Sequence, residues 1–276
     1  MKLFQYFVSV LMFLMISFVA VAFEGSGVAG ARSAAMGRAS VTLSDFWSIQ
    51  NNPAGIAMMS NPAAGIYYEN RFLMKELAMK SGAFVLPVRF GVLGVSFNQF
   101  GYSLYNENKL GIAYARAFSD QLRIGVQLDY LTTQFGDGYE STNNITFELG
   151  VQSDITKKIT VGAFIFNPVK ARLSSYTDER VPVIMRFGVT YHFTEKLFGI
   201  AEIEKNFDLK PGLRTGFEYT INQTFYARIG LSTQPGLLTF GSGFRIGNLN
   251  LDLSAGMHQV LGVSAQAGLI YHFGSK

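Results

Sequence analysis

Apolar and polar residues alternate along most of the chain beyond residue 60. Residues 122–130, Leu-Arg-Ile-Gly-Val-Gln-Leu-Asp-Tyr, show the pattern: every second residue is apolar, while Arg123, Gln127 and Asp129 fall on the opposite face. A period of two residues indicates a β-strand with one apolar face. The alternation predicts an all-β chain of fourteen strands, at residues 62–71, 76–86, 90–99, 108–118, 121–132, 143–153, 158–167, 182–193, 196–206, 212–221, 224–233, 237–246, 248–257 and 262–273.

The lengths of these stretches and of their connections indicate how the strands assemble. Each stretch has about nine to twelve residues, which a tilted strand needs to cross a bilayer, whereas strands of soluble sheets usually have about five or six. Every second connection is a tight turn, and the longer connections fall between these turns, at residues 100–107, 133–142 and 168–181. Outer-membrane barrels alternate short periplasmic turns with longer outer loops in this way. Residues 61–276 are therefore predicted to form a 14-stranded antiparallel transmembrane β-barrel, with both ends of the mature chain on the periplasmic side.

The first 22 residues have the features of a secretory signal peptide. Lys2 is followed by the apolar run 3–19 and by Ala20-Val21-Ala22, a small-x-small cleavage site. Residues 1–22 are therefore predicted to be a cleaved signal peptide; the alternative is a retained membrane helix, because the run is nearly long enough to span a bilayer. The chain contains no cysteine, so neither disulfides nor a lipid-modified cysteine is available.

Residues 23–60 do not share the strand pattern. They are rich in small residues, weakly amphipathic, and end in the turn-forming run Asn51, Asn52, Pro53, Ala54 and Gly55. A barrel of fourteen strands is too wide to be filled by its own side chains, because about eight strands already reach that limit. Residues 23–60 are therefore predicted to be an N-terminal plug, or hatch, inside the lumen.

Two motifs in this region resemble a known group of proteins. Ala31-Arg32-Ser33-Ala34-Ala35-Met36-Gly37, followed by the run 51–55, is similar to the N-terminal region of the PorV/PorQ-type outer-membrane proteins of Bacteroidota. These are related to the long-chain fatty-acid transporter (FadL) family, whose hatch contains an Asn-Pro-Ala element. The resemblance implies a fourteen-stranded barrel with an internal hatch, and a role either in type IX protein export or in the uptake of hydrophobic molecules.

Strand parity places a set of charged residues on the inner face of the predicted barrel. Five are basic and six acidic: Arg123, Asp129, Glu148, Arg186, Glu202, Glu204, Arg214, Glu218, Arg228, Arg245 and Asp252. Because an unpaired buried charge is costly, we expect these residues to pair with one another or with the plug. The resulting network would brace the wall against the plug; the alternative is a substrate path.

Composition narrows the function further. Hydrophobic residues make up 49% of the chain and charged residues only 15%, below the roughly 25% of soluble domains. This balance suits a protein with an apolar outer surface in the bacterial outer membrane. The net charge of +4 is spread without a basic run, which gives no case for nucleic-acid binding. His192, His258 and His272 do not cluster, so neither catalysis, a metal nor a cofactor is expected.

The sequence therefore predicts a non-enzymatic outer-membrane barrel. The favoured hypothesis is a scaffold or shuttle subunit for exported or surface-anchored proteins, as in type IX secretion, with outer-membrane lipids and other outer-membrane or surface-anchored proteins as partners. The alternative is a FadL-like transporter of small hydrophobic molecules, which would open sideways through a kinked or broken wall strand beside Asn52 and Pro53. A structural role in another outer-membrane assembly is a third possibility.

Overall fold

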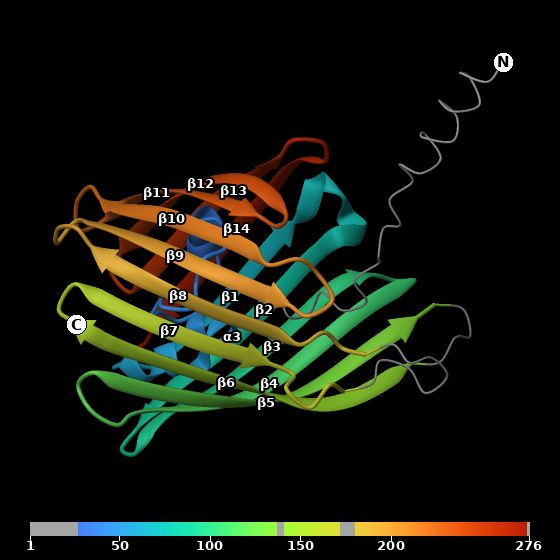
Figure 1. Cartoon of the computed structure of the whole chain (residues 1–276), viewed down its shortest axis with the longest axis horizontal. Coiled ribbons are helices and arrows are strands. Elements are labelled where there is room, and N and C mark those ends of the chain that lie inside the picture. Colours follow the sequence, from blue (N-terminus) through green and yellow to red (C-terminus); the bar gives the residue numbers. More distant parts are fainter. Residues whose placement is uncertain (1–26, 137–140, 172–179, 275–276) are drawn as a thin grey trace.

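Fourteen antiparallel strands close into one barrel (Figure 1). The computed structural model describes residues 27–136, 141–171 and 180–274, and the predicted signal peptide lies outside them. Each strand pairs with its neighbours in the sequence, and the first closes against the last. The strands are β1 (Ala63–Asn70), β2 (Ala78–Val88), β3 (Gly91–Tyr102), β4 (Tyr105–Ala117), β5 (Leu122–Phe135), β6 (Thr142–Thr156), β7 (Ile159–Phe166), β8 (Ile184–His192), β9 (Leu197–Asn206), β10 (Gly212–Thr220), β11 (Phe225–Thr233), β12 (Gly236–Ile246), β13 (Leu249–His258) and β14 (Gly262–His272). The predicted fold class and strand count are confirmed.

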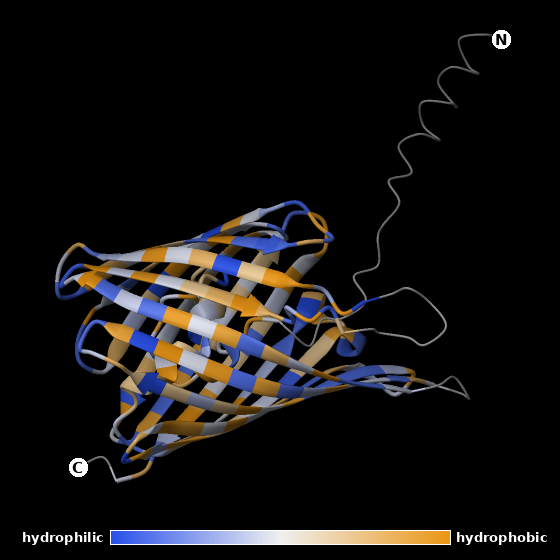
Figure 2. Cartoon of the chain, turned by 60° about the horizontal axis from the view of Figure 1, so that its bottom comes forward, coloured by the Kyte–Doolittle hydropathy of each residue, from blue (hydrophilic) through white to orange (hydrophobic). Residues whose placement is uncertain are grey.

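Apolar side chains cover the outside of the barrel and polar side chains line the inside. In β5, Val126, Leu128 and Tyr130 are exposed, whereas Gln127 and Asp129 between them are buried. Figure 2 shows the same alternation as orange and blue bands along the strands. A soluble sandwich would bury its apolar face, so this arrangement fits a wall that faces lipid.

The connections differ between the two ends of the barrel. We call the end that carries the long β7–β8 connection, residues 167–183, the loop end, and the opposite end, where β14 finishes, the turn end. The loop predicted at 100–107 is wrong, because β3 and β4 continue until Tyr102 pairs with Tyr105. Asn106, inside the predicted loop, points outward from a strand that runs on toward the loop end.

A row of polar side chains crosses the outer face of β2–β6 near the loop end. Its members are direct cross-strand neighbours: Lys80, Gln99, Asn108, Thr132 and Asn143. The next outward row toward the turn end is mainly apolar and consists of Gly82, Phe97, Leu110, Tyr130 and Ile145. The polar row therefore marks the upper edge of the lipid-facing belt, and β3–β6 extend beyond it.

Residues 27–59, which we call the inner segment, lie inside the ring of strands (Figure 1). They contain the short helices α2 (Ala31–Ala35), α3 (Ser48–Asn51) and η1 (Pro53–Met58), while η2 (Arg71–Leu73) and η3 (Lys75–Leu77) belong to the β1–β2 connection. Every residue from 28 to 56 is buried except Arg32, Ser44 and Asp45. In the part of the chain that the structure describes, no helix is both long and apolar enough to cross a membrane.

Glycines on the wall let the inner segment approach closely. Gly125 and Gly150 lie under η1, and a methyl group on Gly125 would sit only 2.6 Å from the carbonyl oxygen of Pro53. Gly162 takes the backbone of Val41 in the same way, at 2.5 Å from its carbonyl oxygen. Real Cβ atoms do not tolerate such distances, so the segment rests on backbone rather than on side chains.

Candidate functional site

The Asn-Pro-Ala run connects the beginning and the end of the inner segment by hydrogen bonds. Asn51 makes a pair of hydrogen bonds with the backbone of Ala29, because its Nδ2 donates to the carbonyl at 2.9 Å and its Oδ1 accepts from the N–H at 3.0 Å. Asn52 Oδ1 accepts from Ala54 N at 3.2 Å and caps η1, in which Pro53 takes the first position. With Gly55 they are all buried. The five residues thus tie the start of the segment to its last turn.

Asn52 also connects the inner segment to the wall. Its Nδ2 donates to Val41 O at 2.6 Å and lies 3.4 Å from Val151 O on β6 and 3.3 Å from Ala163 O on β7. A single amide therefore joins two parts of the inner segment at the seam between two strands.

Residues 40–43 are bound by polar side chains from three strands. Glu202 Oε2 on β9 accepts the backbone N–H groups of Ser40 and Val41, both at 2.7 Å. Gln152 Nε2 on β6 donates to the carbonyls of Val41 and Leu43 at 3.0 and 2.9 Å. On β8, the hydroxyl of Thr190 lies 2.7 Å from that of Thr42. This half of the inner segment is firmly anchored to β6–β9.

Ion pairs fill the lumen toward the loop end. Arg214 contacts Glu202 at 3.2 Å and Glu204 at 2.5 Å, and Arg186 contacts Glu204 at 2.7 Å and Glu202 at 4.0 Å. All four residues were predicted to point inward, and they pair as expected. Their charges balance, so this group braces β8–β10.

A second group joins α2 to the wall near the turn end. Glu218 accepts from Arg32 Nε and Nη2, both at 2.8 Å, and from Arg228 Nε at 2.6 Å. Arg228 also contacts Asp252 at 2.5 Å, and Arg32 contacts Asp45 at 3.2 Å. The predicted residues Glu218, Arg228 and Asp252 thus come together, whereas the sequence analysis did not identify Arg32 or Asp45.

Three other predicted lumen residues, Arg123, Glu148 and Asp129, are buried and have polar partners on the wall. Arg123 pairs with Asp154 at 2.8 Å, Glu148 pairs with Lys109 at 2.6 Å, and Asp129 accepts from a neighbouring glutamine. Buried Lys109 was missed, although strand parity would have found it.

Arg245 corrects the predicted set, because its side chain is exposed instead of belonging to the network. It lies next to the end of β12 and contacts Asn250 at 3.3 Å, where the lumen opens to solvent at the turn end. Among the described residues it forms no ion pair.

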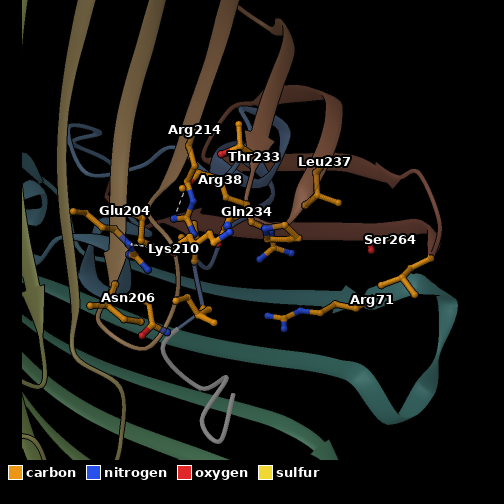
Figure 3. Close-up of a pocket in the computed structure, with 18 of the residues that line it drawn as sticks. Arg38, Arg71, Glu204, Asn206, Lys210, Arg214, Thr233, Gln234, Leu237 and Ser264 are labelled. Carbon is orange, nitrogen blue, oxygen red and sulfur yellow. Dashed lines mark hydrogen bonds and ion pairs between the residues drawn. The ribbon is translucent and has the colours of Figure 1, made fainter. Parts of the chain in front are cut away.

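A cavity of about 560 Å³, which we call the loop-end pocket, lies between the inner segment and the wall (Figure 3). Its apolar lining comes from Val28, Phe72, Ile184, Leu209, Pro235, Leu237 and Leu261. Its charged lining comes from Arg38, Arg71, Arg186, Glu204, Lys210 and Arg214. The pocket has the size of a small-molecule site and combines apolar walls with a few charged groups.

Two of these cations share a further carboxylate. Arg38 of the inner segment forms an ion pair with Glu69 on β1, and Arg71 Nε lies 3.5 Å from the same carboxylate. Gly27 also lines the pocket, so the inner segment starts at the loop end and reaches the turn end before β1. β14 ends at the turn end, whereas Gly27 lies at the loop end; the predicted first residues of the mature chain lie outside the described residues.

A second cavity of about 290 Å³, the turn-end pocket, lies at the other end of the lumen. It is lined by Arg32, Ser44, Asp45, Phe46, Trp47, Met59, Glu218, Tyr226, Arg228, Phe244, Arg245, Asn250, Asp252, Ile270 and His272.

The wall beside Asn52 and Pro53 is continuous. Strands β4, β5 and β6 pair there without a break in register, and the one register shift among the described pairs, between Asp154 and Thr156, lies at the turn end. The sideways opening expected for a transporter at this place is therefore not seen.

Comparison with known proteins shows the fold. No protein-family profile matches the chain, and no curated protein sequence matches it significantly. Among solved structures, the chain is similar to the CymD monoaromatic hydrocarbon channel (TM-score 0.71, 13% identity, covering 91% of this chain and 99% of that one). It is also similar to the toluene transporter TodX of P. putida (0.71, 11%, 91% and 99%) and to TbuX of Ralstonia pickettii (0.68, 12%, 91% and 98%). The chain thus has the fold of FadL-type outer-membrane barrels, which agrees with the predicted location in the bacterial outer membrane.

Proposed function

We propose that this protein takes up small hydrophobic molecules across the bacterial outer membrane. The loop-end pocket is the main support for this proposal. Its volume of about 560 Å³ lies within the usual range of small-molecule binding sites, and it lies inside a closed barrel. Transport channels with the same fold support it. The fold likeness alone does not extend their substrates to this chain, so the pocket lining must indicate the substrate.

The lining favours a hydrophobic molecule that also carries an acidic group. Four arginines, Arg38, Arg71, Arg186 and Arg214, line the pocket, and their partners include the carboxylates of Glu69, Glu202 and Glu204. The exposed Lys210 adds a positive charge at the rim of the pocket. A carboxylate on the ligand would pair with Lys210, while the apolar residues would hold its hydrocarbon part.

The scaffold hypothesis predicted paired lumen charges, and such pairs are present. Ion pairs that hold an internal segment to a wall are equally useful in a transporter, however, so they do not favour a scaffold. A sizeable pocket between segment and wall is expected of a transporter only. Uptake is therefore the better-supported function. Binding of exported or surface-anchored proteins is the alternative that the experiment below would reveal.

Binding of decanoate to the purified barrel in lipid nanodiscs tests the proposal, with decanol as the uncharged counterpart. We expect saturable binding of decanoate, at least tenfold weaker binding of decanol, and at least tenfold weaker decanoate binding in Leu237→Trp, which fills part of the pocket. Leu213→Trp is the matched control, since Leu213 faces lipid on β10. Absence of binding, together with a stoichiometric partner protein in native membranes, would replace uptake by the scaffold function.

A further inference from the structure

The two pockets lie under the same sector of the wall. Along β10 the order is Arg214 in the loop-end pocket, then Gly216, then Glu218 in the turn-end pocket. The same order recurs on three more strands: Thr233, Gly230 and Arg228 on β11; Leu237, Gly241 and Phe244 on β12; Ser264, Gly268 and Ile270 on β14. A glycine therefore separates the two pockets on each of four strands.

The start of the inner segment is packed against these glycines. A methyl group on Gly216 or Gly230 would lie 2.6 or 2.7 Å from Met36 Cα, and one on Gly241 would lie 2.7 Å from Ala35 Cβ. Such distances require the backbone from α2 to Gly37 to touch the wall directly. This contact is the partition between the two pockets.

The partition is bonded to other strands than residues 40–43 are. Thr239 accepts from Gly37 N and donates to Ala35 O, both at 2.8 Å. The other polar link between α2 and the wall is Arg32 with Glu218. Residues 40–43, by contrast, are bonded to β6, β8 and β9, so the contacts of α2 and those of residues 40–43 lie on different parts of the wall.

The chemistry of the turn-end pocket suits an apolar ligand. Four aromatic side chains line it, from Phe46, Trp47, Tyr226 and Phe244. Its three arginines are matched by three carboxylates, Asp45, Glu218 and Asp252, so the pocket as a whole is neutral. The buried indole N–H of Trp47 has no partner among the described residues, and such a group is normally satisfied by a ligand or by water.

We propose that the turn-end pocket is a second binding site, from which the transported molecule leaves the barrel, and that α2 separates it from the loop-end pocket. This inference rests on the proposed uptake function. The site takes the hydrocarbon or aromatic part of the ligand between its rings, without adding net charge. A shift of α2 away from Gly216, Gly230 and Gly241 joins the two pockets into one passage along β10–β14.

A disulfide that ties α2 to the wall tests the partition. A Cβ on Gly268 would lie 3.8 Å from Ala31 Cβ, which is the usual separation in a disulfide, and the chain has no cysteine of its own. In Ala31→Cys/Gly268→Cys we expect oxidation to lower the uptake of radiolabelled decanoate by whole bacterial cells at least tenfold. Reductant should restore uptake, decanoate affinity in nanodiscs should be the same in the oxidised and reduced protein, and the uptake of each single cysteine variant should not respond to oxidation.

A second variant tests the site itself. Asn250→Trp narrows the turn-end pocket from the inner face of β13, and Leu249→Trp, on the lipid-facing side of the same strand, is the control. We expect Asn250→Trp to reduce uptake several-fold and to weaken binding in the turn-end pocket, while binding in the loop-end pocket keeps the parent affinity. A crystal soaked with an iodinated decanoate should show anomalous density in both pockets.

The outcomes separate this inference from the proposed function. If the parent protein neither binds decanoate nor raises its uptake, the function itself is wrong. If the parent does both, but the oxidised tether and Asn250→Trp transport at the parent rate or only the loop-end pocket binds iodine, the function stands and the second site is refuted.

Discussion

Replacing Glu202 by glutamine tests how the inner segment is held, because one buried carboxylate serves both the segment and the wall. Glu202 Oε2 accepts the N–H groups of Ser40 and Val41, and Oε1 accepts from Arg214. In Glu202→Gln, the amide NH₂ must face either the two backbone donors or the guanidinium of Arg214. Donors oppose each other in both orientations, so at least one of these contacts is lost.

The expected cost follows from burial and charge. The Glu202 side chain is fully buried, and its replacement removes one negative charge from the ion-pair group around Arg186 and Arg214. A hydrogen bond to a charged group is worth about 1.5–3 kcal/mol, and removing one member of a buried ion pair costs about 3–5 kcal/mol. We therefore expect Glu202→Gln to lower the free energy of unfolding by about 3–5 kcal/mol.

Urea unfolding in lipid vesicles measures this loss with two separate signals. The only tryptophan of the chain, Trp47, is buried in the inner segment and reports its release by fluorescence, while the electrophoretic mobility of the unheated protein reports the barrel wall. Exposed Glu195→Gln is the control and should change stability by less than about 0.5 kcal/mol. If Glu202→Gln unfolds within about 1 kcal/mol of the parent in both signals, the assigned role of this carboxylate is refuted.

Three further predictions concern the inner segment. Deleting residues 24–58 should leave a foldable barrel with raised ion conductance in planar bilayers; conductance equal to that of the intact protein would show that the segment does not occlude the lumen. Gly230→Ala should also raise the resting conductance, but by less than the deletion, since its methyl group displaces Met36 from the wall. Gly236→Ala is the control and should leave the conductance unchanged, because no atom lies within 4 Å of the added methyl group. Asn52→Ala should destabilise the inner segment by about 0.5–2 kcal/mol, because η1 loses its N-cap and the carbonyl of Val41 loses one of its two donors, and an unchanged urea midpoint of Trp47 fluorescence would contradict this.

The wall could be predicted from the sequence because lipid imposes a strict rule on it. Every outward position must be apolar, so the period of two residues runs through each strand, and the predicted stretch 212–221 differs from Gly212–Thr220 by one residue. The rule weakens beyond the lipid, where both faces are polar. Asn106 therefore suggested a loop although it lies on a strand, in register with Gln134.

The site could be predicted only on the wall side. Strand parity identified Glu202, Arg214 and Glu218 as inward-facing, since their neighbours in the sequence face lipid. Their partners in the inner segment follow no period, because that segment is buried on all sides and consists of short turns. Arg32 was therefore not recognised as the partner of Glu218, and the pockets, which arise from the fit between segment and wall, left no signal in the sequence.

The position of the inner segment has a consequence for assembly. The segment precedes all fourteen strands in the chain, yet α2 lies against β12, β13 and β14, which are synthesised last. The final sheet ladder joins Ala63 to His272, so the chain must close a loop of nearly its whole length around a segment that is already inside. Contacts between such distant residues form slowly, because the entropy of loop closure must be paid before the contacts are gained. We therefore expect the pairing of β1 with β14 to be a late, slow step of folding.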